Sequence, residues 1–559
     1  MSLFTLSPKQ KQSLPILVLW LGMGLMGQVE AQVTNQLTLP SLPPTSAVTN
    51  TPPVNPATIP APGATMPSTL DLTPSPESAV PSPKAANAAP TDPTSFESTA
   101  TIVSDPLLSP VTSILAALFA FASIAGFLLY QSGLTRAKNC GHAATVLLVG
   151  LLFGIVGYWM GGFAVEIGGV GDAHAALSTS MSEADKLSLD HELGLIIGGH
   201  HWGFMGSAGF FLASDANAAE TTQTLFLGQV ALLTIMLAAT LGAALERGRI
   251  VALAIGAFVI GALIFPLPAN WVWGGGWLAE LGREFGLGHG LVDWTGAGAV
   301  HEAAGTLAFI LALKLGPRYG RFKKEKAARE IPGHHMPFAI LGALILLLSW
   351  TGINAFAHGA SAPAAVHTLL AAAGGLVITF LLAGWRRVRP TPALLCRGLL
   401  GGAVASCGSG ALVDPWAAFL IGAIAALLVQ ATFAFLERRR IDDPVGAAAV
   451  HGAGGAWGLI ATGLFANGTL GNGLNGIKTP VTGLFYGGHG SQLAAQFLGV
   501  VTCFVVVFVL GLACFTIVQK IVGLRVHLED ETEGLDWPQT GAFGYQGDIE
   551  PEKTSPSGG

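Results

Sequence analysis

Two histidines, His301 and His451, lie 150 positions apart inside two copies of one thirteen-residue pattern. The copies begin at Asp293 and Asp443, and both fit Asp-x-x-Gly-Ala-x-Ala-Val-His-x-Ala-x-Gly within otherwise apolar sequence. An ionisable ring in the apolar part of a membrane is costly, and such residues usually mark a pathway or a site. Two of them at matching positions indicate two halves of one protein that present their histidines to one place.

The same pattern suggests what the two rings could do. Each histidine follows its aspartate by eight residues, or about 12 Å of helix, which is near the middle of a hydrocarbon core of ~30 Å. Glycines five residues before and four residues after each histidine keep both helices slim, so the rings can touch. Two neutral imidazoles in contact share one proton and still offer polar atoms to a passing molecule. The alternative is that each histidine only forms a hydrogen bond across a helix pair.

A narrow pore past two such rings suits a small neutral polar molecule. A bare cation in a dry apolar pore would cost on the order of tens of kcal/mol. A weak base that leaves its proton at the mouth avoids most of that cost, and the histidines could carry or return the proton. Burial favours the neutral form of both imidazoles.

The composition gives the class of protein. Apolar residues make up 51% of the chain, charged residues only 11%, and 74 residues are glycine. Soluble proteins contain about 25% charged residues, so we predict an all-α, polytopic membrane protein with the lipid bilayer as its surroundings and no nucleic-acid partner. The many glycines allow the helices to approach one another closely within the bilayer.

Metal and catalytic chemistry find little support in the sequence. None of the five cysteines has the spacing of metal ligands, and we predict that they are small core residues. The segment from His301 to Gly305 begins like the zinc-binding helix of metalloproteases, but the second histidine of that motif is replaced by Gly305. No nucleophile is accompanied by a base. We therefore predict no metal, no cofactor and no enzymatic activity.

The amino-terminal region differs from the rest of the chain. Lys9 and Lys11 precede a short apolar run and a small-residue site at Ala31, so we predict a cleaved signal peptide at residues 1–31, with an uncleaved anchor as the alternative. Residues 32–105 are rich in Pro, Thr, Ser and Ala and are predicted to form a disordered extracytoplasmic linker. A membrane domain at residues 106–523 and a polar, acidic cytoplasmic tail at 524–559 would follow.

The membrane domain contains eleven apolar segments of membrane-spanning length. We predict helices at 107–131, 141–163, 222–245, 250–268, 295–314, 336–356, 364–384, 392–411, 415–436, 445–466 and 492–522. Arginines and lysines concentrate in alternate loops, which indicates an outside amino terminus and a cytoplasmic carboxyl terminus. The outer loop at 164–221, with His191, His200 and His201, is predicted to be a plain solvated loop, and the alternative is an acidic surface that concentrates cations before the pore.

The histidine helices are the fifth and the tenth in this order. The repeat unit is therefore five helices, followed by one further helix at the carboxyl end. Because five is odd, the second unit is inverted relative to the first, which is the plan of many transporters. Asp293 then lies at the outer start of its helix and Asp443 at the inner start, where each carboxylate complements a helix dipole.

These motifs strongly resemble those of the ammonium transporter/Rhesus superfamily, and most closely those of the bacterial ammonium transporters. The resemblance covers residues 107–545. It rests on LYQSGLTRAKN at 129–139, VWGGG at 272–276, DWTGAGAVHEAAG at 293–305, DDPVGAAAVHG at 442–452 and GLRVHLEDETEGLD at 523–536.

The resemblance implies a homotrimer in the plasma (inner) membrane, with a separate pore for ammonium/ammonia in each subunit. Trp273 matches a tryptophan that recruits ammonium at the outer mouth, where an aromatic face attracts a cation. Asp293 matches an aspartate that supports this recruitment site, and Asn354 an asparagine beside the pore. His301 and His451 match the twin pore histidines. The tail implies coupling between subunits and leaves open a signalling protein of the PII type as a partner.

The chain departs from the family pattern at the outer side of the pore. Leu232 and Ile353 fall where the family has two stacked gate phenylalanines, although a gap in the third helix would bring Phe226 near the first position. Ala357 replaces the serine of the recruitment site. Methylammonium is therefore an obvious competitor for ammonium. The alternative function is an ammonium sensor of the same fold that signals through its tail.

Overall fold

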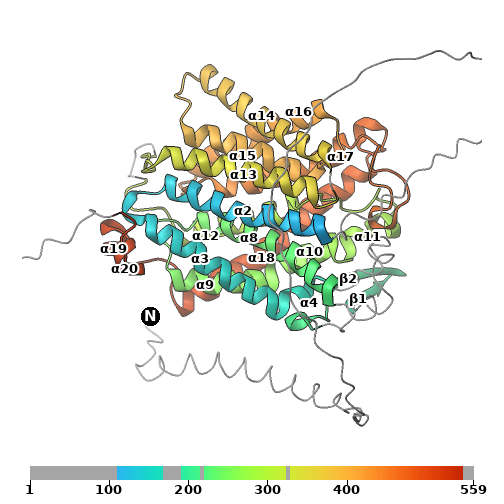
Figure 1. Cartoon of the computed structure of the whole chain (residues 1–559), viewed down its shortest axis with the longest axis horizontal. Helices are drawn as coiled ribbons and strands as arrows, with labels where there is room; N and C mark the ends of the chain where they lie inside the picture. The colour runs from blue at the N-terminus through green and yellow to red at the C-terminus, as the bar shows by residue number, and fades with distance from the viewer. Residues whose placement is uncertain (1–109, 168–190, 214–218, 323–327, 360, 546–559) are drawn as a thin grey trace, which may run out of the picture. The chain divides into compact units, whose positions relative to one another are not determined.

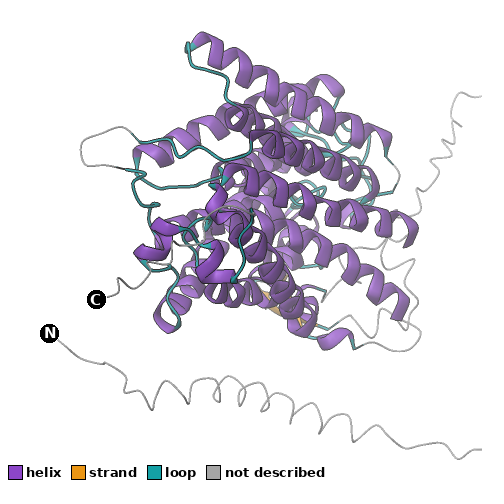
Figure 2. Cartoon of the chain, turned by 60° about the vertical axis from the view of Figure 1, so that its left-hand side comes forward, coloured by secondary structure: helices purple, strands orange, loops and turns teal. Residues whose placement is uncertain are grey.

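The computed structural model describes residues 110–167, 191–213, 219–322, 328–359 and 361–545 (Figure 1). The predicted signal peptide and linker, residues 1–31 and 32–105, lie outside the described residues. Helix dominates the described residues, and strand is confined to one hairpin (Figure 2).

All eleven predicted membrane segments are helical in the structure. They are α2 (Pro110–Leu134), α3 and α4 (Cys140–Gly157, Phe163–Glu166), α8 (Ala219–Gly242), α9 and α10 (Ile250–Val259, Pro266–Trp273), α12 (Ala303–Leu315), α13 (Met336–Phe356), α14 (Ala362–Trp385), α15 (Pro392–Ser409), α16 (Pro415–Arg438), α17 (Gly454–Phe465) and α18 (Ser491–Ile521). In the described ranges, nine helical stretches are long and apolar enough to cross a membrane. The other two predicted segments are filled by the 18 residues of α15 and by α17 with the turn before it.

Four of these helices contain a π-helical turn. The turns are η3 (Tyr158–Gly162), η5 (Ile260–Ile264), η6 (Ala297–Glu302) and η7 (Ala448–Ala453). Such turns insert one residue into the helical register and occur often at functional sites. The last two turns carry His301 and His451, so the repeated sequence pattern corresponds to a repeated backbone irregularity.

Small residues allow the helices to pack closely. α2 lies along α13, and α14 packs on both α15 and α16 (Figure 1). The two histidine segments pack reciprocally, since α12 contacts η7 and α17 contacts η6. This arrangement puts the two copies of the repeated pattern at the centre of the helical core.

The described part of the outer loop predicted at 164–221 includes an ordered hairpin, whose first strand is mostly exposed, in agreement with a solvated loop, and whose second strand is partly buried. β1 (Glu192–Ile197) and β2 (His200–Gly206) form an antiparallel hairpin. It packs on the short helix α11 (Trp277–Phe285), where the Trp202 and Trp277 rings lie 5.4 Å apart. His201 Nδ1 lies 3.2 Å from a carboxylate oxygen of Glu280, so this histidine belongs to a packed interface.

The acidic tail folds back onto the membrane domain. It contains two short helices, α19 (Leu528–Glu533) and α20 (Asp536–Thr540). The Asp536 carboxylate accepts a hydrogen bond of 2.8 Å from the backbone N–H of His142, at the start of α3. Arg525 forms an ion pair of 2.8 Å with Glu531, whose carboxylate also accepts the backbone N–H of Tyr319. The tail is thus fixed to the predicted cytoplasmic ends of α3 and α12.

Candidate functional site

An aspartate carboxylate organises the start of each histidine segment. Asp293 accepts hydrogen bonds of 2.7–3.1 Å from the backbone N–H groups of residues 296–299. Asp443 accepts two, from Ala447 at 3.0 Å and Ala448 at 2.8 Å. The first N–H groups of a helix have no partner within the helix, so a carboxylate at this position satisfies them and sets the direction in which the helix starts.

The two histidine segments cross in opposite directions with their backbones in contact. A Cβ atom at Gly305 would lie 2.0 Å from the backbone nitrogen of Gly452. A Cβ atom at Gly455 would lie 2.2 Å from the carbonyl oxygen of Ala297. Residue 297 of the first segment therefore lies beside residue 455 of the second, and residue 305 lies beside residue 452. The residue numbers rise along one segment and fall along the other. This antiparallel crossing agrees with a repeat of inverted topology.

The crossing brings the two imidazoles into direct contact. Nδ1 of His301 lies 3.0 Å from Nδ1 of His451, and the rings are stacked with centroids 5.1 Å apart. The two residues are 1% and 4% exposed. Two neutral rings can form this contact only if one donates from Nδ1–H and the other accepts at Nδ1. The donor ring then has an acceptor at Nε2, and the other ring has an N–H donor there.

Two aromatic residues that the sequence reasoning missed enclose this pair. The Trp350 ring contacts His301 edge-on at 5.2 Å and His451 at 5.9 Å between ring centroids. Phe127 lies 5.9 Å from His451 and also contacts Trp350. In the described part of the chain, the buried Nε1–H of Trp350 has no hydrogen-bond partner. Apolar residues abound in both helices, so only the packing reveals which of them face the histidines.

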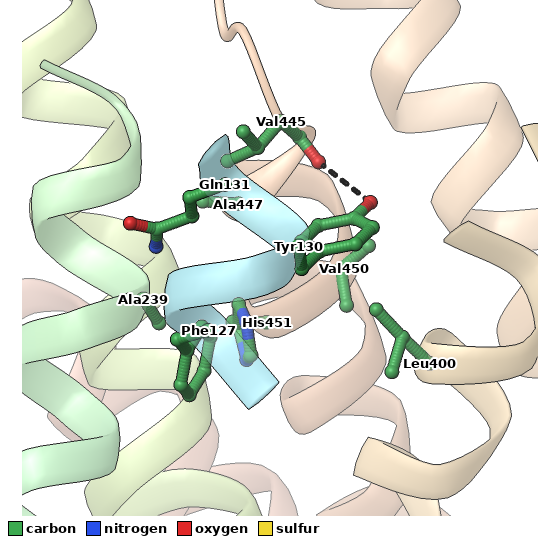
Figure 3. Close-up of a pocket in the computed structure, with 9 residues that line it drawn as sticks. All are labelled: Phe127, Tyr130, Gln131, Ala239, Leu400, Val445, Ala447, Val450 and His451. Carbon is green, nitrogen blue, oxygen red and sulfur yellow. Dashed lines mark hydrogen bonds between the residues drawn. The ribbon is translucent and has the colours of Figure 1, made fainter. Parts of the chain in front are cut away.

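A small cavity lies beside His451, on the side toward the start of its segment (Figure 3). It is lined by Phe127, Tyr130, Gln131, Ala239, Leu400, Val445, Ala447, Val450 and His451. The Tyr130 hydroxyl donates to the carbonyl oxygen of Val445 at 3.2 Å (Figure 3). The cavity is about large enough for one water molecule. It provides a polar-edged space on one side of the histidine pair.

Trp273 and Asp293 lie together at the start of the His301 segment. The indole Nε1–H of Trp273 donates to the backbone oxygen of Asp293 at 3.0 Å, and the ring lies over Gly296. Trp273 is partly exposed, whereas the Asp293 carboxylate is buried among backbone N–H groups. The aromatic face is therefore available to a ligand, and the carboxylate supports the local backbone.

Asn354 forms a hydrogen-bond network next to the start of the His301 segment. Its amide donates to the hydroxyls of Thr368 at 2.7 Å and Ser406 at 3.2 Å, and its side-chain oxygen accepts from Thr295. Its backbone oxygen accepts from Trp294 at 3.0 Å. The residue is fully buried. Asn354 thus connects α13, α14 and α15 to the loop that precedes the His301 segment.

The three positions at which the chain departs from the family pattern have different surroundings. Ile353 is buried, and Leu232 is partly buried against the same core cluster. Ala357 follows the last residue of α13 and is partly exposed. Phe226 stacks on Tyr158 at 5.4 Å and contacts Phe163 edge-on at 5.9 Å. The only alternative gate phenylalanine that the sequence offered is therefore part of an aromatic cluster with η3 and α4.

A network of charged residues lies directly before the His451 segment. Arg318 bonds the Asp442 carboxylate at 2.8 Å and Glu246 at 3.1 Å. Burial raises the pKa of Asp442, but the charge and hydrogen bonds of Arg318, together with Arg247, outweigh it and hold that pKa well below its usual range. The network fixes the residue directly before Asp443 and hence the entry into the second segment.

The sulfur and acidic groups do not form a metal centre in the described residues. No three His, Cys, Asp or Glu side chains lie close enough there to hold a metal ion. The five cysteines are free, and four of them are buried. The described site presents the imidazole pair, the aromatic rings around it and the backbone N–H groups held by Asp293.

Comparisons with known proteins agree with this arrangement. The model of the Ammonium Transporter Family matches residues 111–545. The ammonium transporter Amt2 of Archaeoglobus fulgidus is 34% identical over 431 residues, which cover 75% of this chain and 84% of that protein. Ammonium transporter 1 member 1 of Arabidopsis thaliana is 32% identical over 393 residues, covering 64% of this chain and 77% of that one.

Solved structures share the fold. A structure described as a sensor Amt protein superposes with a TM-score of 0.64 at 27% identity, covering 78% of this chain and 99% of that chain. Mep2 of Candida albicans gives a TM-score of 0.61 at 23% identity, over 80% of this chain and 92% of its own. The second similarity concerns the fold alone.

Proposed function

This chain belongs to the ammonium transporter family, and on that premise we propose that it conducts ammonium past the His301–His451 pair. It is a multi-pass membrane protein, and we assign it to the plasma (inner) membrane with its amino terminus outside and its carboxyl terminus in the cytoplasm. The observation that carries the mechanism is the 3.0 Å contact between the two Nδ1 atoms at the crossing of the repeats.

Recruitment begins at the outer end of the first segment. The partly exposed face of Trp273 attracts NH₄⁺ through its ring quadrupole. The Asp293 carboxylate supports this site from behind, since it holds the backbone N–H groups of residues 296–299. The cation then loses its proton near the entrance, because a charged species in the dry path ahead is strongly disfavoured.

The neutral amine next meets the two imidazoles. Ammonia has one lone pair and three N–H groups, so it can accept a hydrogen bond from one ring and donate to the other. The pair offers one donor and one acceptor at its two Nε2 atoms. These roles exchange when the Nε2 acceptor takes up a proton, the shared proton moves between the Nδ1 atoms, and the other Nε2 releases its proton, so that both rings stay neutral. The proton released at the entrance could follow by way of this pair.

The substitutions at the gate positions bear on selectivity. Leu232 and Ile353 place aliphatic side chains where the family has stacked phenylalanines, and Ala357 offers no hydroxyl to a bound cation. We propose that the vestibule binds ammonium more weakly than in relatives with those groups, and that methylammonium competes with it. We also propose a homotrimer, in which each subunit contains its own pore.

Uptake of labelled methylammonium by cells that lack other ammonium carriers tests the transport function. Expression of the chain is expected to restore uptake, and excess ammonium to suppress it. His301→Ala combined with His451→Ala is expected to abolish proton-coupled uptake and currents in vesicles. The matched control is His489→Ala with His527→Ala, which removes two exposed histidines outside the pore and leaves uptake unchanged. Unchanged uptake in the first pair of substitutions would rule out the role of the imidazoles.

A sensor of the same fold is the second candidate. It is favoured by the similarity to the solved sensor Amt protein and by the tail, in which Leu535 donates a backbone hydrogen bond of 2.9 Å to Asn139. A tail fixed to helix ends in this way could report a change in the membrane domain, to another subunit or to a PII-type protein. Ammonium binding without uptake, accompanied by altered hydrogen exchange in residues 528–540, would favour the sensor.

A further inference from the structure

Trp273, to which we assign the recruitment of the cation, lies at the end of a short helix. α10 has eight residues, and Trp273 is its last one, directly before Gly274, Gly275 and Gly276. Glycine adopts many backbone conformations, and Gly275 has a φ of +94°, which most other residues avoid. α11 begins immediately after these glycines. The local sequence therefore does not fix the position of the Trp273 ring, and contacts with other elements must do so.

Two buried side chains at the end of α10 donate hydrogen bonds to backbone oxygens of other elements. The Asn270 amide donates to Glu166, the last residue of α4, at 2.6 Å. The Trp271 indole N–H donates to Phe204 of β2 at 2.8 Å. Asn270 and Trp271 are 0% and 7% exposed, whereas Trp273 is partly exposed. The buried side chains thus attach the end of the helix to its neighbours and leave the Trp273 ring accessible.

Trp271 and Trp273 lie on opposite sides of α10. Residues two positions apart in an α-helix point about 200° apart around its axis. Trp271 points toward β2, where its N–H bonds Phe204. Trp273 points toward the loop before the His301 segment, where its N–H bonds Asp293. The hairpin of β1 and β2 therefore holds the helix from the side opposite the ring that faces the ligand.

The same hairpin also contacts α11. The Trp202 ring of β2 lies 5.4 Å from the Trp277 ring and 5.4 Å from the Phe285 ring, measured between centroids. Nδ1 of His200 lies 3.0 Å from a carboxylate oxygen of Glu284. Since β2 contacts both α10 and α11, the hairpin bridges the two helices that the three glycines connect (Figure 1). It restricts a turn that its own residues leave free to change conformation.

We propose that Trp271 is a positioning residue for ammonium recruitment. Its bond to the hairpin holds the end of α10 and thereby places the Trp273 ring at the outer mouth. The hairpin thus sets the affinity of the first binding step and takes no part in the passage of the amine between the histidines. This role rests on the proposed recruitment of NH₄⁺ at Trp273.

The concentration dependence of labelled methylammonium uptake by cells that express the full-length chain tests this role. Trp271→Phe keeps an aromatic ring but removes the N–H donor. We expect it to raise the KM about threefold to tenfold, as for the loss of one hydrogen bond, and to change the maximal rate by less than about twofold.

Trp457→Phe is the matched control. Its indole N–H also donates to a backbone oxygen, that of Ile421 at 2.9 Å, but this bond joins α17 to α16. We expect Trp457→Phe to change the KM by less than about twofold, because it removes the same kind of bond without affecting α10. An equal increase in KM for Trp271→Phe and Trp457→Phe would overturn the positioning role.

A Trp273→Ala background shows whether Trp271 acts through Trp273. Trp273→Ala alone is expected to raise the KM. Trp271→Phe added to it is expected to change the KM by less than about twofold, because the ring that Trp271 positions is then absent. If Trp271→Phe raises the KM equally in both backgrounds, or leaves it unchanged when Trp273→Ala raises it, the positioning role is wrong. An unchanged KM for Trp273→Ala itself would contradict recruitment at Trp273, and the positioning role with it.

Trp202→Ala provides a second variant if Trp271→Phe does not fold. It removes the packing of the hairpin on α11 and leaves α10 unaltered. We expect it to raise the KM in the same direction, by about threefold or more, as for the loss of two aromatic pairs. An unchanged KM would mean that the hairpin does not hold the recruitment site.

Discussion

The two histidine segments begin as copies of one pattern and end in different surroundings. Both start with an aspartate, bend through a π-helical turn and present a buried imidazole. The Asp293 carboxylate accepts four backbone N–H groups, whereas Asp443 accepts two. The repeat has therefore preserved the backbone that positions the ring, while the support of each segment has diverged.

The residue after each histidine differs most. It is Glu302 in the first segment and Gly452 in the second. Gly452 lies at the crossing, where its backbone faces Gly305. Glu302 is only 3% exposed, and its Oε2 atom has no hydrogen-bond partner in the part of the chain that the structure describes. One segment thus provides close contact and the other carries a buried acid.

The ends of the two segments that carry the aspartates also face different groups. The first is next to an exposed aromatic face, that of Trp273, which suits a cation. The second is next to the charged network of Arg318 and Asp442. An inverted repeat would present equivalent ends to opposite sides of the membrane, so the proposed path would then have a different chemistry at each end.

Among the substitutions that compare the two segments, Gly305→Ala is expected to lower the free energy of unfolding most. Its Cβ atom would lie 2.0 Å from the backbone nitrogen of Gly452, and backbone cannot move aside without separating the two segments. We expect a loss of about 3 kcal/mol or more, in the upper range of overpacking. Gly452→Ala is the matched control, because its Cβ atom would lie 3.6 Å from the nearest atom and should cost less than about 1 kcal/mol. Thermal unfolding in detergent measures both, and equal losses would contradict the antiparallel crossing.

The carboxylates provide the next test. Asp293→Asn replaces an oxygen that accepts two N–H groups with a donor and removes the charge from the other two bonds. We expect a loss of about 2–3 kcal/mol for Asp293→Asn and about 1 kcal/mol for Asp443→Asn, from the number and charge of the hydrogen bonds. The midpoint of thermal unfolding should therefore fall further for the first variant. A larger fall for the second would mean that the network around Asp442 depends on Asp443 more than these bonds indicate.

Much of this fold follows from the sequence because a bilayer imposes length and polarity on each helix. The prediction of helices at 336–356 and 492–522 agrees within one residue with Met336–Phe356 and Ser491–Ile521. The contact between His301 and His451 also follows from the repeat and its glycines. The sequence thus predicts the elements and the two central rings.

Other features depend on contacts between segments that are distant in the chain. The π-helical turns need packing that favours one inserted residue, and apolar periodicity does not reveal it. Trp350 and Phe127 are two aromatics among many, and only the crossing of helices places them at the histidines. The exposure of the outer loop agrees with its prediction, but its hairpin was not predicted, because β2 packs on α11, which is distant in the chain.

Glu302→Met is expected to change the free energy of unfolding least, and to raise it. Glu302 is buried, its backbone packs against Gly455, and its Oε2 atom has no partner in the described residues. Replacing an unsatisfied buried acid with an apolar side chain of similar length removes a desolvation cost, so we expect a gain of about 1 kcal/mol. Thermal unfolding measures this gain, and Gly452→Ala again serves as the comparison at the equivalent position. If Glu302→Met unfolds at a lower temperature, the acid has a partner that stabilises it, and the two segments would then differ by a bound group as well as by a residue.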